Sequence, residues 1–130
     1  MRKIFFMSLS TVGTVAFDAI ETPFGKTDKI VGGAATYIAW SASYFSKLIN
    51  IVSVIGDDFD MKELELLKNE NGANKTRGKV DTRGIDIKEG KKSFFWSGKY
   101  HMDMNTRDTL TTDLNVLMEF NPIVPDDYQS

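Results

Sequence analysis

The feature that most constrains this chain is a nearly continuous run of β-branched residues, Ile49 to Ile55. Such a run is typical of a strand in a parallel sheet that is covered on both faces. Before it, the pair Gly32 and Gly33 opens an uncharged stretch, residues 34–46, which predicts a helix buried on most of its sides. After it, Gly56-Asp57-Asp58 predicts a turn. This order indicates an α/β fold, and open α/β sheets usually bind polar small molecules beside such glycines and helix N-termini.

The remaining segments predict a second group of strands that does not obviously join the first sheet. We predict further strands at residues 2–7, 12–17, 81–87 and 92–101, a turn or short hairpin at 21–29, a helix at 60–68 and a loop at 69–79. Residues 110–120 have features of both a helical and an extended segment. Strands that follow an α/β start in this way often form a flap over a binding site.

Composition excludes several classes of function. The 130 residues are enough for one modest domain or for part of a larger one, and no segment approaches the length of a membrane span. Sixteen basic against eighteen acidic residues give a net charge of −2, so we expect neither nucleic acid nor an anionic membrane as partner. The absence of cysteine excludes disulfides and thiolate chemistry, and it fits a cytoplasmic protein. With His101 as the single histidine, we expect no metal site.

The stretch from Gly32 to Gly56 resembles the first sequence motif of the PfkB/ribokinase family of sugar and nucleoside kinases. The small residues of that motif stand at matching spacings, at Gly32, Gly33, Ala34, Ala35, Ala39, Ser46 and Gly56. The sequence departs from the motif at Tyr37, where the family has an asparagine.

Segments on both sides of this motif extend the resemblance over most of the chain. Gly13 to Asp18 is similar to the family's first strand, which ends in a substrate-binding aspartate. Gly56 to Phe59 resembles a Gly-Asp-Asp-Phe turn, and Val80 to Ile85 resembles the segment that leads into the lid strands. Ser93 to Tyr100 resembles a lid strand. Each match alone is weak, whereas their joint occurrence is specific.

The resemblance implies an α/β fold, the N-terminal part of a ribokinase-like fold. Its parts are a parallel sheet flanked by helices and a small β lid drawn from about residues 14–31 and 80–110. The family's catalytic Gly-Ala-Gly-Asp segment, which supplies a general-base aspartate and an anion hole, does not occur in this sequence. We therefore expect residues 1–130 to be the N-terminal portion of a kinase domain without its ATP-binding half. The full-length enzyme would use ATP and Mg²⁺ to phosphorylate a hydroxymethyl group of a sugar or nucleoside, whereas this chain alone would bind neither cofactor and would lack the catalytic base.

The resemblance also implies which residues bind the substrate. The candidates are Asp18, Gly32, Gly33, Tyr37, Phe95, Trp96 and Arg107. A carboxylate suits a diol because it offers several lone pairs and no competing donor, and glycine lets the main chain approach a ligand closely. Each candidate has an ordinary structural alternative: a turn-capping aspartate, a glycine turn before a helix, aromatic packing between strands, and an arginine in a solvated loop.

Two other interpretations stay open. The chain is alternatively a non-catalytic α/β module that binds a polar ligand or self-associates, because a parallel sheet of two or three strands leaves an open edge. A homodimer of this kind would use the lid strands or the exposed sheet edge. The third interpretation is a truncation product without a present function.

Overall fold

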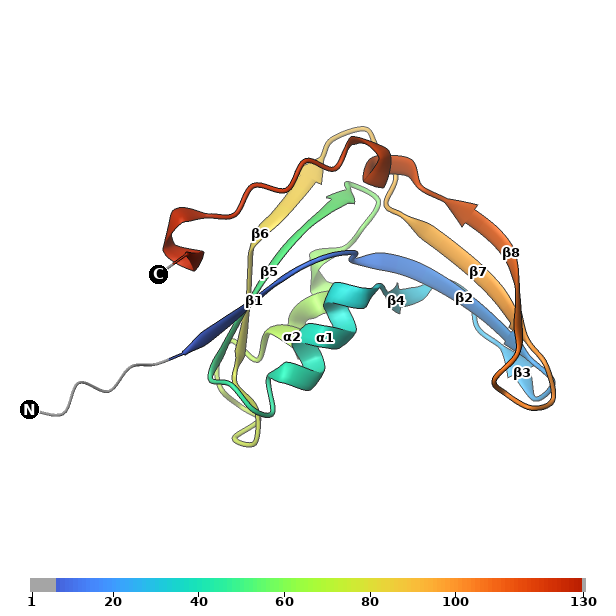
Figure 1. The fold of residues 1–130 in the computed structure, drawn as a ribbon, viewed down its shortest axis with the longest axis horizontal. Helices are drawn as coiled ribbons and strands as arrows, with labels where there is room; N and C mark the ends of the chain where they lie inside the picture. Colours follow the sequence, from blue (N-terminus) through green and yellow to red (C-terminus); the bar gives the residue numbers. More distant parts are fainter. Residues whose placement is uncertain (1–6, 130) are drawn as a thin grey trace, which may run out of the picture.

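The computed structural model describes residues 7–129, which form two sheets with helices on one side (Figure 1). The first sheet is parallel, has the order β1-β5-β6 and consists of β1 (Ser8–Val12), β5 (Leu48–Gly56) and β6 (Lys79–Lys88). The second has the order β3-β2-β7-β8 and consists of β2 (Ala16–Thr22), β3 (Gly25–Lys26), β7 (Phe95–Tyr100) and β8 (Arg107–Asp113), with β4 (Ile30–Gly32) paired to β2. The helical elements are α1 (Ala34–Ala42), α2 (Glu65–Lys68) and the 3-10 turns η1 (Met61–Leu64), η2 (Asn115–Glu119) and η3 (Asp126–Tyr128). We call the first sheet with α1 and α2 the body, and the second sheet the lid.

The hydrophobic core lies in the body, where α1 and α2 cover one face of the parallel sheet (Figure 1). Every residue of β5 after Leu48 is buried, which confirms the prediction of a strand covered on both faces. The side chains that β5 directs toward the helices are Ile49, Ile51 and Ile55, which belong to one core cluster with residues of both helices. On the opposite face, the Tyr128 ring packs against Gly84 of β6.

Helix α1 is shorter and more exposed than the uncharged stretch 34–46 predicts. It ends at Ala42, and its buried residues are Ala35, Thr36 and Ala39. The Tyr37 side chain is about half exposed, and Phe45, in the turn after the helix, is 92% exposed. The prediction of burial on most sides is therefore wrong, because one face of α1 packs on β5 and an uncharged sequence does not itself supply partners for the other faces.

The first strand within residues 7–129 is β1, Ser8–Val12, although no strand was predicted between residues 7 and 12. Residues 2–6 of the strand predicted at 2–7 lie outside the described residues. β1 is at the edge of the parallel sheet, and four of its five residues are exposed. Its backbone pairs with β5 regardless of side-chain polarity, which is why the apolar pattern did not locate it.

Other elements follow the predictions, with one reassignment. The pairing of β2 with β3 joins Glu21 to Lys26 and Thr22 to Gly25, within the residues 21–29 where a turn or short hairpin was predicted. The helix predicted at 60–68 begins at Asp60, whose carboxylate accepts the Lys62 N–H at 2.9 Å, although its first turn is the 3-10 turn η1. Residues 79–88, which the resemblance assigned to the lid, form β6 and pair with β5, so they belong to the body. The lid instead extends through β8 to Asp113.

Candidate functional site

Asp18 lies in β2, beside the short strand β4 that ends at the glycine pair. The two strands are antiparallel, with Ala16 opposite Gly32 and Asp18 opposite Ile30. The Asp18 carboxylate occupies the space over Gly32, since a Cβ atom added there would lie 2.0 Å from Oδ2. The structure thus brings two of the predicted site residues into direct contact, and any side chain at position 32 would displace the carboxylate.

Gly33 joins β4 to α1 in a conformation that other residues rarely adopt. Its φ is 95°, and an added Cβ atom would lie 2.4 Å from the Thr14 carbonyl oxygen. Its backbone N–H donates a hydrogen bond to the Asp18 carboxylate. Backbone dihedral and lack of space both require glycine at this position. The bend therefore fixes the carboxylate beside the start of α1.

Thr14 completes this arrangement, and sequence analysis missed it. Its hydroxyl accepts the Ala34 N–H at 2.9 Å, and its carbonyl accepts the Ala35 N–H at 2.9 Å. These bonds satisfy the first N–H groups of α1, which a ligand would otherwise use. A local sequence pattern cannot predict this cap, because Thr14 and Ala34 are 20 positions apart in the sequence. The Ala34 and Ala35 N–H groups are therefore engaged by Thr14, whereas the Asp18 carboxylate beside them accepts a hydrogen bond from the Gly33 N–H.

The electrostatic state of Asp18 reflects its partial burial. Burial raises the pKa of its carboxyl group above the ordinary value of 3.8, and the Gly33 N–H opposes this by stabilising the charged form. A carboxylate that has lost part of its hydration gains most from donors that replace the missing water. Hydroxyl groups of a polyol are such donors, and two of them can share the lone pairs of one carboxylate.

β7 of the lid places Trp96 beside Asp18. The parallel register pairs Phe17 with Phe95 and Asp18 with Trp96. Because successive side chains of a strand point to opposite faces, Trp96 shares the face of Asp18, whereas Phe95 shares the face of Phe17. Phe17 stacks on Phe59 with ring centroids 4.8 Å apart, and Phe95 packs against the same core cluster. The structure therefore brings Trp96, and not Phe95, to the Asp18 side of the lid.

Arg107 extends this face of the lid to β8. The Trp96 indole lies along its own strand, since a Cβ atom at Gly98 would be 2.2 Å from Cη2. Its Nε1 donates to Thr109 Oγ1 at 3.4 Å, and the Arg107 guanidinium lies 5.6 Å from the ring centroid. Carboxylate, indole and guanidinium thus occupy three neighbouring strands on one face, whereas the sequence favoured a solvated loop for Arg107.

Tyr37 lies apart from this group. Its side chain is 55% exposed and lines a hollow of about 290 Å³ between α1 and residues 63–67. Val31 lines the same hollow and is the register partner of Phe17, so the hollow is on the core side of β4. The structure therefore does not bring Tyr37 to the Asp18 carboxylate.

The predicted Gly-Asp-Asp turn holds the entry to the lid. Asp58 Oδ1 accepts both the N–H and the hydroxyl of Ser93 at 2.8 Å, and Asp57 Oδ2 accepts the Gly90 N–H at 2.7 Å. The Ser93 hydroxyl in turn accepts the Gly56 N–H at 2.9 Å. Both carboxylates are thus engaged by the loop that precedes β7, which supports a structural role over a substrate role.

Metal chemistry and membrane insertion find no support in residues 7–129. Within that range, no three His, Asp or Glu side chains are grouped so that they can hold a metal ion. His101 pairs with Asp108 at 2.9 Å in the lid. The helices of the described part are all too short or too polar to cross a bilayer.

Comparison with solved structures identifies the fold. A nucleoside kinase from Burkholderia thailandensis in complex with inosine aligns with a TM-score of 0.63 at 15% identity, over 87% of this chain and 37% of that one. A nucleoside kinase from Methanocaldococcus jannaschii, an archaeal member of the ribokinase family, gives 0.64 at 18%, over 92% and 42%. The ribokinase from Cryptococcus neoformans var. grubii serotype A in complex with ADP gives 0.63 at 18%, over 85% and 35%.

Sequence comparisons add nothing to this: no protein-family model and no curated protein matches the chain. The chain spans 35% to 42% of the length of the three kinases. The alignments cover the N-terminal part of those chains, and the shared features are an α/β fold with a parallel sheet and helices. The chain therefore has the fold of the N-terminal part of the ribokinase-like kinases.

Proposed function

We propose that this chain supplies the substrate side and the lid of an ATP-dependent kinase that phosphorylates a hydroxymethyl group of a sugar or nucleoside. The observation that carries the proposal is the Asp18 carboxylate, which is held over Gly32 and by the Gly33 N–H at the start of α1. The aligned structures support it, because one holds inosine and another holds ADP.

Each residue of this group has a distinct role in the proposal. Asp18 accepts hydrogen bonds from two substrate hydroxyls and fixes the orientation of the sugar ring. Gly32 and Gly33 allow the main chain to approach it. Trp96 covers an apolar face of the substrate and excludes water, which favours phosphoryl transfer over hydrolysis. Arg107 lies at the outer edge of this face, where it attracts the electron-rich atoms of the substrate.

ATP and Mg²⁺ belong to the complete enzyme in this proposal. They supply the phosphoryl group and neutralise its charge during transfer. Residues 7–129 hold no group of three His, Asp or Glu side chains suited to a metal ion. We therefore assign the catalytic Mg²⁺, together with the ATP molecule that reacts, to other parts of the complete kinase. A homodimer formed through the lid strands or the open edge of β1 stays a prediction.

Calorimetric titration of the 130-residue chain with pentoses and nucleosides tests the substrate assignment. We expect one class to bind and the Asp18→Asn variant to lose at least about tenfold in affinity, because hydrogen bonds to a charged acceptor are worth about 1.5–3 kcal/mol. Asp28→Asn, an exposed aspartate outside the site, is the matched control and should bind as the parent does. Equal affinity of the parent and Asp18→Asn would contradict the proposal.

A phosphoryl-transfer assay tests the proposal that the catalytic base lies outside the 130-residue chain. With ATP, Mg²⁺ and the best ligand, the 130-residue chain should form no phosphorylated product, because the described residues contain no base at an anion hole. Product formation by the purified chain would show that this assignment of the catalytic base is wrong.

A further inference from the structure

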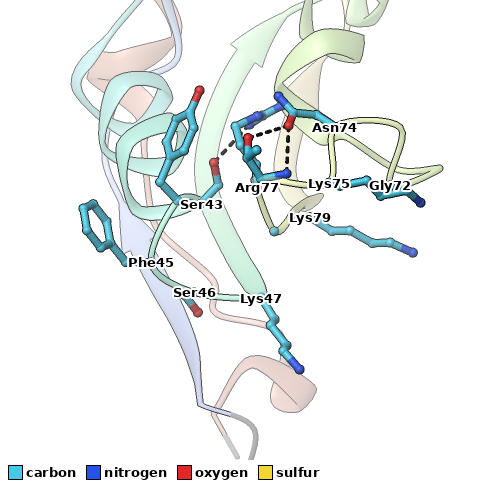
Figure 2. Close-up of a pocket in the computed structure, with 12 residues that line it drawn as sticks. Ser43, Phe45, Ser46, Lys47, Gly72, Asn74, Lys75, Arg77 and Lys79 are labelled. Carbon is cyan, nitrogen blue, oxygen red and sulfur yellow. Dashed lines mark hydrogen bonds between the residues drawn. The ribbon is translucent and has the colours of Figure 1, made fainter.

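A second hollow, of about 480 Å³, is lined by residues of the body (Figure 2). It is bounded by residues 43–47, after α1, and by residues 72–79, before β6. These segments adjoin the starts of β5 and β6, whereas the lid adjoins their carboxyl ends. The nine residues of β5 are separated by steps of about 3.3 Å, so roughly 26 Å lies between its first and last residues.

The lining of this hollow is positively charged, whereas the chain as a whole is negatively charged. Four of its twelve residues are cationic and none is a carboxylate, although the chain as a whole carries a net charge of −2. The cationic residues are Lys47, Lys75, Arg77 and Lys79. A concave surface lined by one sign of charge concentrates ions of the other sign. The hollow therefore favours anions.

Arg77 gives the hollow a buried positive charge without a carboxylate partner. Its side chain is 8% exposed, and its guanidinium donates to the Ser43 hydroxyl at 3.0 Å and to the carbonyls of Leu66 and Leu67. It also lies 4.2 Å from the centroid of the Trp40 ring. Within residues 7–129, no carboxylate pairs with it, and its Nε has no hydrogen-bond acceptor.

The partners of the Arg77 guanidinium are a hydroxyl, two carbonyls and an aromatic ring, all of them neutral, so its positive charge adds to the positive potential of the hollow. Figure 2 shows Arg77 on the inner side of the hollow, with the side chains of Lys75 and Lys79 extending toward its outside. The volume is typical of sites for small molecules. We propose that this hollow binds a small phosphate-bearing molecule, whose phosphate is held by Lys75 and Lys79 at the mouth, with the buried charge of Arg77 behind them.

Titration of the ¹⁵N-labelled 130-residue chain, followed by amide chemical shifts, tests this site. ADP, inorganic tripolyphosphate and adenosine are the three probes. We expect ADP and tripolyphosphate to shift the amides of residues 43–47 and 72–79, and adenosine to leave them unchanged. Binding should weaken between low salt and about 0.15 M salt, because charge pairs at the mouth are screened.

Variants at the mouth separate the site from general charge effects. The double variant Lys75→Gln/Lys79→Gln should lose about tenfold or more in affinity for ADP, corresponding to about 1.4 kcal/mol. The matched control Lys26→Gln/Lys62→Gln removes two exposed lysines elsewhere and should bind as the parent does. Arg77 is left intact, because it also ties α1 to the end of α2.

Three results would overturn the proposal: no shifts in these segments at millimolar probe, equal losses in both double variants, or much tighter binding of a single-stranded oligonucleotide. The last would indicate a nucleic-acid surface. Ligand binding at Asp18 is measured separately with sugars and nucleosides, so either site can fail without the other.

Discussion

The body and the lid of this chain are stabilised in different ways. In the body, β5 lies between two parallel neighbours and is buried over nearly its whole length. In the lid, the edge strand β8 has one half-buried residue and is otherwise exposed. Apolar burial therefore holds the body, whereas backbone pairing and a few specific contacts hold the lid. This leaves a face of the lid free for polar groups such as Asp18.

The largest expected effect compares matched truncations in the two regions. Ile51→Ala removes a fully buried side chain from β5 and should lower the free energy of unfolding by about 2–5 kcal/mol. Leu110→Ala removes a side chain that is 57% exposed in β8 and should change it by less than about 0.5 kcal/mol. Urea denaturation measures both. Similar losses in the two variants would show that the lid contributes to stability as the body does.

A smaller effect is expected at the junction of the two regions. Ser93→Ala removes the acceptor for the buried Gly56 N–H and the donor to Asp58, so it should cost about 1–3 kcal/mol. Hydrogen exchange should become faster in β7 while β5 keeps its protection, because the lid loses its anchor first. Ser97→Ala, in β7 itself, is the control and should leave exchange unchanged. Uniformly faster exchange in both sheets would contradict an independent lid.

The sequence predicted buried strands better than exposed elements for a physical reason. A strand such as β5 is buried on both faces, so its β-branched pattern is read from the sequence directly. β1 escaped the prediction because an edge strand needs only backbone pairing. The exposure of α1 was also not predicted. An uncharged composition shows that a helix can be buried, but it does not show which element would cover it.

A local effect should sharpen the role of the lid face. Gly98→Ala would place a Cβ atom 2.2 Å from the Trp96 ring, so the indole must leave its position along β7. An off-rotamer displacement costs about 0.5–1.5 kcal/mol, so the fold should persist. In a Trp40→Phe background, Trp96 fluorescence should change, and affinity for the Asp18 ligand should fall. Gly13→Ala, where the added Cβ meets Ala35 at an ordinary 3.5 Å, is the matched control.

The site was predicted in part, and the misses follow from strand geometry. The resemblance to the ribokinase family named Asp18 and the glycine pair as candidates, and the structure brings the three residues together. The resemblance named both Phe95 and Trp96 as candidates on a lid strand, yet adjacent strand residues face opposite ways. Thr14 was missed because its bonds to α1 join residues that are distant in sequence.

The smallest expected effect is the pH dependence that Asp18 gives to stability. Burial raises the folded-state pKa of Asp18 above its unfolded value, so the folded state binds this proton more tightly. Linkage then makes the free energy of unfolding fall as pH rises from the unfolded pKa through the folded pKa, and level off above it. The Asp18→Asn variant has no ionisable group at this position, so it does not lose this stability as the pH rises. The variant should melt up to about 2 °C higher than the parent near neutral pH.

This difference should disappear at about pH 3, where both proteins are uncharged at position 18. Thermal denaturation at the two pH values measures it, with Asp28→Asn as the exposed control. If the parent instead gained stability over Asp18→Asn on raising the pH, the carboxylate would be a structural group of the lid. If Asp18→Asn is more stable than the parent but binds the ligand more weakly, Asp18 serves binding at a cost in stability.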